Sequence, residues 1–125
     1  MSDYGLWPMI AVGTWSGGVM FLIFFTLNRR PWPGIAVEEA LARGAMIVDV
    51  RTPEEFGAGA ISGAVNLPVD ALGVRIHELD RSHPVIVYCA TGERSKRAAK
   101  ILRAAGIDVV DARNFGAFAD HLRPV

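Results

Sequence analysis

Hydrophobic and polar positions divide this chain of 125 residues into two parts. From Tyr4 to Asn28 there is no charged side chain, and the central apolar run, Leu6–Leu27, is 22 residues long. A helix of that length extends about 33 Å, which is enough to cross the hydrocarbon core of a bilayer. From Ile35 onward, short apolar runs alternate with amphipathic stretches. The pattern therefore predicts one membrane-spanning helix followed by a globular domain.

The sequence around the apolar run favours an uncleaved anchor over a signal peptide. A signal peptide begins with a positive segment, whereas no Lys or Arg precedes Arg29. Aromatic residues flank the run as they do at membrane interfaces, namely Tyr4, Trp7 and Trp32. We predict a short tail at residues 1–5 and a transmembrane helix at residues 6–28. A signal peptide and a buried soluble helix are the alternatives.

The residues after the apolar run predict the orientation of the chain. Arg29 and Arg30 follow the run directly, and positive residues next to a transmembrane helix favour the cytoplasmic side. The prediction is a single-pass protein of the inner or plasma membrane with its C-terminal domain in the cytoplasm. Pro31–Gly34 contains two prolines and a glycine, which do not continue a helix. Residues 29–34 are therefore a predicted linker.

Residues 35–125 are predicted to form a single α/β domain. Continuous apolar runs alternate with helical patterns, which is typical of a parallel sheet with helices on both faces. Thr52 and Glu55 have the spacing of a capping box at a helix start. The predicted strands are Met46–Val50, Ala64–Leu67, Pro84–Tyr88 and Asp108–Val110. The predicted helices are Val37–Arg43, Pro53–Phe56, Asp70–Leu79 with Asp70 as its N-cap, Ser95–Ala105 and Phe115–Leu122.

Cys89 is the only cysteine of the chain, and it lies directly after the apolar stretch Val85–Tyr88. Ligands of parallel sheets bind beyond the carboxyl ends of the strands, and here a short polar loop and a helix start follow the thiol. The N–H groups of such a loop and the positive end of a helix favour an anion, so we expect the thiolate to be stabilised. Cys89 is therefore the predicted nucleophile rather than a buried structural cysteine.

Composition argues against several other classes of protein. Lys plus Arg and Asp plus Glu each total 13, so the formal net charge of the chain is zero. The chain therefore has no excess of positive charge to attract a polyanionic partner, and no nucleic acid is expected. A single cysteine cannot form an internal disulfide. The three histidines are far apart in the sequence, and one thiol cannot build a thiolate zinc site. We predict no metal and no cofactor.

Two stretches of the domain resemble the signatures of the rhodanese family. The first, residues 47–68, is similar to the family pattern D-V-R-x-P-x-E-F-x-x-G-H-I-x-G-A-x-N-[IL]-P, with Ala60 where the family usually has His. The second, residues 88–102, is similar to the catalytic stretch Y-C-x-x-G-x-R-S-x-x-A-A-x-x-L. The resemblance spans residues 35 to about 121 and does not cover the predicted anchor. It implies a single rhodanese-like domain.

The resemblance also implies a sulfurtransferase that carries sulfur as a Cys89 persulfide. The donor would be thiosulfate or a low-molecular-weight persulfide, and the acceptor a thiol, or cyanide in an assay. Loop N–H groups would hold the persulfide charge, Arg94 would offer a planar fork to an anionic donor, and Ser95 would be the N-cap of the next helix. The predicted active-site loop consists of Ala90, Thr91, Gly92, Glu93, Arg94 and Ser95.

Asp49 and Arg51, at the end of the first predicted strand, are assigned a supporting role. Their side chains can orient neighbouring loops through hydrogen bonds, and we favour this role over one in the chemistry. The bilayer is an expected partner of the anchor. The anchor would hold the domain close to a membrane protein of sulfur metabolism and so raise its effective concentration there.

Two functional alternatives remain. One is a non-enzymatic, membrane-tethered module that uses the same fold to carry sulfur or bind a partner. The other is a cysteine-dependent phosphatase or arsenate reductase, whose tyrosine-phosphatase pattern has His before the cysteine and Arg six positions after it. Here Tyr88 precedes Cys89 and Arg94 follows five positions on, so the loop is one residue short. The first turns of the predicted helix after the cysteine loop carry three cations, Lys96, Arg97 and Lys100. These side chains either form a solvated polar face or steer anionic donors to the site.

Overall fold

The computed structural model describes residues 19, 20, 23 and 32–124. The chain divides into two compact units, Met1–Pro31 and Trp32–Val125. Of the predicted transmembrane helix at residues 6–28, only Val19, Met20 and Ile23 are described, and they are helical. No helix within the described ranges is both long and apolar enough for a membrane span. The anchor and its orientation therefore lie almost wholly outside the described residues and stay predictions.

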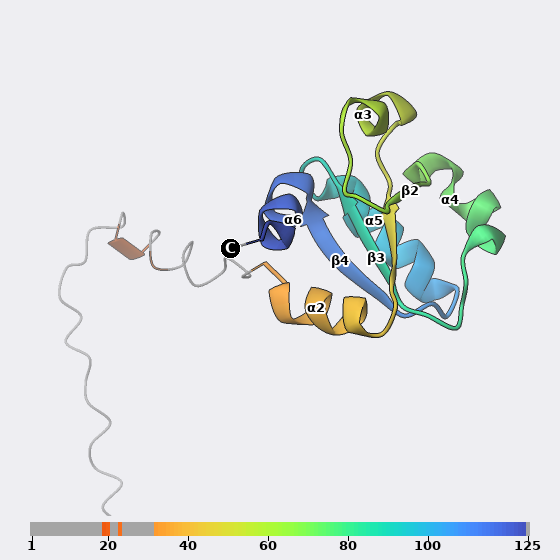
Figure 1. The fold of residues 1–125 in the computed structure, drawn as a ribbon, viewed down its shortest axis with the longest axis horizontal. Coiled ribbons are helices and arrows are strands. Elements are labelled where there is room, and N and C mark those ends of the chain that lie inside the picture. Colours follow the sequence, from red (N-terminus) through yellow and green to blue (C-terminus); the bar gives the residue numbers. More distant parts are fainter. Residues whose placement is uncertain (1–18, 21–22, 24–31, 125) are drawn as a thin grey trace, which may run out of the picture. The chain divides into compact units, whose positions relative to one another are not determined.

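The second unit is built on a sheet of four parallel strands, as the sequence predicted (Figure 1). The structure places these strands in the order β2-β1-β3-β4. The two central strands, β1 and β3, are rich in apolar and β-branched residues, and every side chain of β3 is buried. This is the composition expected of strands covered on both faces. The strands are β1 (Met46–Asp49), β2 (Val65–Asn66), β3 (Val85–Cys89) and β4 (Val109–Asn114).

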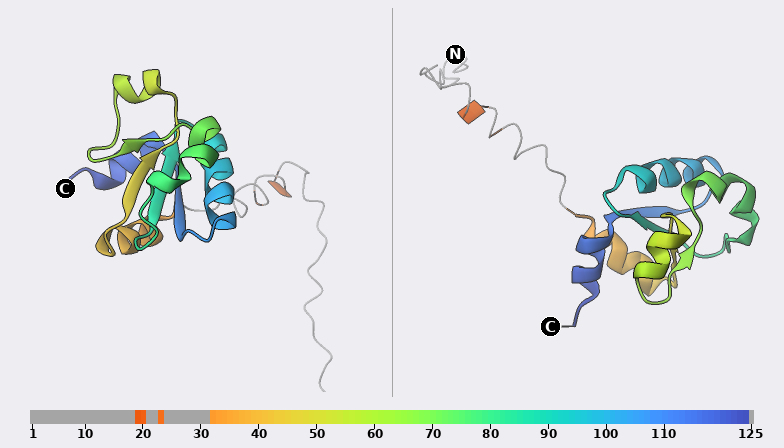
Figure 2. Two further views of the ribbon diagram at one scale, coloured as in Figure 1. Left: turned by 90° about the vertical axis from the view of Figure 1, so that its right-hand side faces the viewer. Right: turned by 90° about the horizontal axis from the view of Figure 1, so that it is seen from above.

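Helices cover both faces of this sheet (Figure 2), which confirms the predicted α/β architecture. Side chains alternate along β3, because successive residues of a strand point to opposite faces. Val87 and Cys89 belong to a core with the residues of α4 and α5, while Ile86 and Tyr88 belong to a core with α2 and α6. The helices are α2 (Gly34–Ala42), α3 (Pro53–Ala58), α4 (Val69–Arg75), the short 3-10 helix η1 (Ile76–Glu78), α5 (Glu93–Ala104) and α6 (Phe115–Leu122).

Helix starts were predicted with mixed success. The capping box is confirmed, because Thr52 Oγ1 accepts a hydrogen bond from the Glu55 N–H and the Glu55 carboxylate accepts one from the Thr52 N–H. The prediction that Asp70 caps the next helix is wrong. Helix α4 begins one residue earlier, at Val69, after Pro68. Asp70 lies in the first turn, where its negative charge still favours the helix.

Trp32, predicted to lie near a membrane interface, packs against other residues of the domain. Its indole N–H donates a 2.7 Å hydrogen bond to the Ala112 carbonyl. The ring centroid lies 6.1 Å from that of Phe118 and 4.6 Å from that of His121. Helix α2 also begins at Gly34, inside the stretch predicted as linker. The compact unit therefore includes Trp32.

Candidate active site

Cys89 is the last residue of β3, at the carboxyl end of the parallel sheet. Its side chain has no exposed surface. The sulfur accepts a hydrogen bond from the backbone N–H of Gly92, with 3.0 Å between nitrogen and sulfur. A backbone N–H directed at sulfur stabilises negative charge there, as the donors of an oxyanion hole do for oxygen. The structure therefore places at least one such donor on Cys89.

The loop after Cys89 is shorter than predicted, because helix α5 begins at Glu93 rather than at Ser95. Gly92 is the N-cap, with φ of 106°, a backbone conformation that glycine adopts at little cost. The assignment of Ser95 as N-cap is therefore wrong. Ser95 is buried in the first turn, and its hydroxyl donates to the carbonyls of Gly92 at 3.1 Å and Arg113 at 3.3 Å. It ties the loop to the end of β4.

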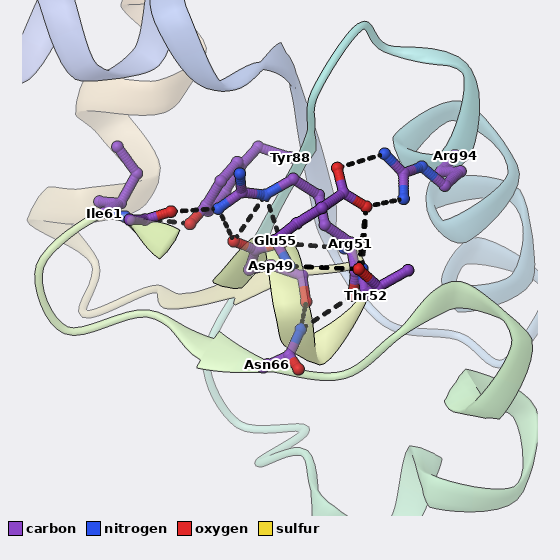
Figure 3. Close-up of polar contacts among 9 residues, drawn as sticks. Asp49, Arg51, Thr52, Glu55, Ile61, Asn66, Tyr88 and Arg94 are labelled. Atoms are coloured by element: carbon purple, nitrogen blue, oxygen red, sulfur yellow. Dashed lines mark hydrogen bonds and ion pairs between the residues drawn. The ribbon is translucent and has the colours of Figure 1, made fainter. Parts of the chain in front are cut away.

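Arg94 was predicted to offer its guanidinium to an anionic donor. In the structure its two terminal nitrogens bind the two carboxylate oxygens of Glu55, at 2.6 and 3.0 Å (Figure 3). Both side chains are about one-third exposed. The hydrogen bonds from Arg94 lower the pKa of Glu55 from 4.5 to about 2. Because Glu55 also closes the capping box of α3, this pair fastens α3 to the first turn of α5.

We expect Glu55 to contribute to stability in a definite pH range. Its pKa is lower in the folded chain, so the ionised carboxylate stabilises the fold above about pH 4.5, and this contribution is lost as the pH falls towards 2. Glu55→Gln should therefore flatten the pH dependence of the unfolding midpoint between these values. Urea unfolding at a series of pH values measures this, with Glu54→Gln, one position earlier and exposed, as the control. Parallel profiles for wild type and Glu55→Gln would contradict the expectation.

Asp49 and Arg51 form a buried ion pair at the carboxyl end of β1 (Figure 3). Nη2 of Arg51 lies 2.7 Å from Asp49 Oδ2, and its Nε binds both carboxylate oxygens, at 3.1 and 3.0 Å. Arg51 also donates to the Gly59 carbonyl at 2.6 Å, and its guanidinium carbon lies 4.8 Å from the centroid of the Phe115 ring. Within the structure the pair thus connects the end of β1 with the segment after α3 and the start of α6.

Tyr88 and Asn66 extend this buried network. The Tyr88 hydroxyl accepts a 3.0 Å hydrogen bond from the Ile61 N–H, and burial, assisted by Asp49, raises the pKa of Tyr88 to about 12. The Asn66 amide donates to the carbonyls of Asp49 at 3.1 Å and Arg51 at 2.9 Å. Asn66 was not singled out from the sequence. Its only signal was its place in the family pattern, which does not say what an amide at the end of β2 contacts.

The remaining loop and helix residues lie at the surface. Ala90, Thr91 and Glu93 are exposed around the buried Cys89. Among the cations of α5, Lys96 and Lys100 are exposed, and Arg97 makes a 3.3 Å ion pair with Asp70 across exposed side chains. An exposed pair of this kind contributes little to stability. Within the described part of the chain, no cluster of three or more His, Cys, Asp or Glu side chains could hold a metal ion.

The sequence profile of the Rhodanese-like domain matches residues 36–119, and the chain belongs to this family. It is 36% identical over 101 residues to the uncharacterised protein YqhL of Bacillus subtilis, covering 78% of this chain and 80% of that protein. It is also 36% identical over 61 residues to a sulfurtransferase of Allochromatium vinosum, covering 49% of this chain and 57% of that one.

Solved structures show the same fold. A rhodanese-related protein from Thermoplasma volcanium superposes with a TM-score of 0.61 at 27% identity, over 73% of this chain and 91% of that one. A rhodanese from E. coli, solved with anions, superposes with a TM-score of 0.55 at 32% identity, over 58% of this chain and 89% of that one. Both similarities agree with the family assignment.

Proposed function

We propose that this protein is a sulfurtransferase that moves sulfane sulfur through a persulfide on Cys89. The observation that carries the proposal is the 3.0 Å hydrogen bond from Gly92 N–H to the Cys89 sulfur, at the start of α5. A helix start and a backbone donor favour a negatively charged sulfur, in the thiolate and in the persulfide alike. The similarity to a protein named sulfurtransferase supports the same reaction.

The proposed reaction has two steps. The Cys89 thiolate attacks the outer sulfur of thiosulfate, a new S–S bond forms, the S–S bond of the donor breaks, and sulfite leaves with the electron pair. The persulfide anion then gives its terminal sulfur to a thiolate or to cyanide, which forms an acceptor persulfide or thiocyanate and restores the Cys89 thiolate. Charge balances in each step, and no further oxidant or reductant is needed. Two displacements replace one difficult transfer, which is the advantage of covalent catalysis.

The loop residues have distinct roles in this proposal. Gly92 supplies an N–H to the sulfur and takes the left-handed backbone conformation that the turn requires. Ser95 holds the loop against β4 through its two hydrogen bonds. Arg94, bound to Glu55, fixes the first turn of α5 rather than presenting an open fork. Asp49 and Arg51 hold the end of β1 in place and do not reach the thiol in any contact described above.

A binding module without turnover is the second candidate, and the burial of Cys89 favours it. Because the sulfur has no exposed surface, a donor can reach it only if the residues around it move. Treatment of the full-length protein with thiosulfate, followed by mass spectrometry, separates the two functions. One sulfur added to Cys89, together with thiocyanate formation from cyanide, supports the transferase. An unmodified thiol and no thiocyanate would favour the binding module.

We also propose that residues 6–28 anchor the domain to the inner or plasma membrane, with the domain in the cytoplasm. The long uncharged run and the position of Arg29 and Arg30 after it support this orientation. Thiosulfate or a small persulfide is the proposed donor and a thiol the acceptor, with a membrane protein of sulfur metabolism as a proposed neighbour.

Truncation provides the test of the anchor. A fragment beginning at Trp32 should leave the membrane fraction and keep its transferase activity, because every contact of the cysteine loop described above lies beyond that residue. A fragment beginning at Ile35 should be less stable, since it loses the Trp32 contacts with Ala112, Phe118 and His121. Membrane fractionation, urea unfolding and a reporter after Val125 check these outcomes. A reporter active only outside the cytoplasm would overturn the orientation, and a fragment from Trp32 that stays with membranes would overturn the anchor.

A further inference from the structure

The ion pair of Glu55 and Arg94 lies at the start of helix α5, next to the cysteine loop (Figure 3). Arg94 follows two residues after Gly92, whose N–H binds the Cys89 sulfur. Hydrogen bonds to Glu55 raise the pKa of Arg94, and the negative charges of Glu55 and of the Cys89 sulfur act in the same direction. The guanidinium is therefore close enough to the sulfur for the two charges to interact.

Hydrogen bonds from two residues hold the Glu55 carboxylate in place. Its Oε1 accepts from Arg94 Nη1 at 2.6 Å, from the Thr52 N–H at 3.2 Å and from the Thr52 hydroxyl at 3.1 Å. Its Oε2 accepts from Arg94 Nη2 at 3.0 Å. The pKa of Glu55 is about 2, so the carboxylate is ionised at neutral pH. Both terminal nitrogens of Arg94 are thus bound to a carboxylate that α3 itself keeps in position.

This pair has a consequence for the charge of a sulfur donor. Thiosulfate carries two negative charges, and a guanidinium attracts such an anion mainly through its forked N–H groups. To use the fork of Arg94, thiosulfate has to displace the Glu55 carboxylate and then stay close to its negative charge. Glu93, at the start of α5, is a further exposed carboxylate next to the loop. Like charges placed close together repel, so these carboxylates disfavour a dianion more than a donor with less charge.

We infer that Glu55 is a specificity-determining residue, which occupies Arg94 and thereby favours sulfur donors of low negative charge over thiosulfate. This inference rests on the proposed sulfurtransferase function and narrows its donor class to persulfides and other donors with at most one negative charge. Thiosulfate then serves as an assay donor that the site binds weakly. Removal of the Glu55 charge releases Arg94 and should improve the binding of a dianion.

The test uses two donors that differ by one charge, with cyanide as the acceptor and the full-length protein in detergent. Methanethiosulfonate has a methyl group where thiosulfate has an oxygen, and it carries one negative charge instead of two. In both reactions the Cys89 thiolate attacks the outer sulfur and the S–S bond of the donor breaks. Sulfite or methanesulfinate leaves with the electron pair. A change in the ratio of the two KM values therefore reports the charge that the site accepts.

Glu55→Gln should lower the KM for thiosulfate by about threefold to tenfold, as expected for removal of one partly exposed charge. The KM for methanethiosulfonate should change by less than about twofold, because that donor has one negative charge instead of two. The glutamine oxygen can still accept the hydrogen bond from the Thr52 N–H, so the capping box is kept. Glu55→Ala is a second uncharged variant and should shift the ratio in the same direction. A KM does not depend on the fraction of folded enzyme, so a less stable variant still gives the ratio.

Two controls separate the Arg94 contact from net charge. Glu54→Gln removes the same charge at an exposed position directly before Glu55, and it should change neither KM by more than about twofold. The double variant of Glu55→Gln and Arg94→Gln should lose the gain for thiosulfate, because the guanidinium that Glu55→Gln releases is then absent.

Several outcomes would overturn the inference. An unchanged or higher KM for thiosulfate in both uncharged variants would show that Glu55 does not restrict the donor. Equal gains for both donors would mean that Glu55 limits access rather than charge. An equal gain in Glu54→Gln would reduce the effect to net charge, and a gain that persists in the double variant would show that Arg94 takes no part. Failure of the unmodified protein to transfer sulfur from either donor would instead overturn the proposed function, and the inference with it.

Discussion

Replacement of Cys89 by serine is expected to abolish thiosulfate:cyanide sulfurtransfer, with a fall of at least about 10³-fold in kcat/KM. A serine hydroxyl at this position can still accept the hydrogen bond from the Gly92 N–H, but it is a far weaker nucleophile and forms no persulfide. The substitution exchanges one buried atom for a smaller one, so we expect the domain to stay folded.

Mass spectrometry and unfolding measurements separate loss of chemistry from loss of structure. After treatment with thiosulfate, the wild-type protein should carry one added sulfur at Cys89, and Cys89→Ser should carry none. The urea midpoint of Cys89→Ser should stay close to that of the wild type. Activity that persists in the variant would exclude the persulfide mechanism, because the chain contains no second cysteine to replace the first.

Much of the fold could be predicted because residues that are close together in the sequence indicate each strand. Val85–Tyr88 is a short apolar run between polar loops, which is the pattern of a strand buried on both faces, and the structure confirms it with one more residue, Cys89. The capping box of Thr52 and Glu55 is likewise local, since both partners lie within one helical turn. Such features depend on residues close in sequence, and the chain alone therefore defines them.

Contacts between distant residues could not be predicted in this way. Glu55 was interpreted only as a capping residue, although its carboxylate also binds Arg94, 39 positions away. Arg94 was interpreted as a guanidinium available to an anionic donor. The sequence pattern does not show which side chain a guanidinium contacts in the folded chain. The helix start was misplaced because Ser95 is a good N-cap residue, whereas the structure uses Gly92 in a left-handed conformation and buries Ser95.

Removal of the Asp49 carboxylate should cause the largest loss of stability among these predictions. Asp49→Asn is expected to cost about 3–5 kcal/mol in the free energy of unfolding, because it leaves the Arg51 guanidinium buried without its counter-charge. Only 8% of the Arg51 side chain is exposed, so water can solvate little of that charge. The Gly59 carbonyl and the Phe115 ring still contact Arg51, but neither supplies a negative charge.

The exposed ion pair of Arg43 and Asp108 provides a matched comparison. Its N–O distance of 2.9 Å is close to the 2.7 Å of the buried pair, yet its side chains are 64% and 58% exposed. Asp108→Asn should therefore cost less than about 1 kcal/mol. Urea unfolding of the fragment from Trp32, which contains both pairs, measures the two variants under the same conditions. A loss in Asp49→Asn as small as that in Asp108→Asn would mean that Arg51 reaches water when its partner is removed. The segment after α3 would then be held in place by other contacts, such as the hydrogen bond from Ile61 to Tyr88.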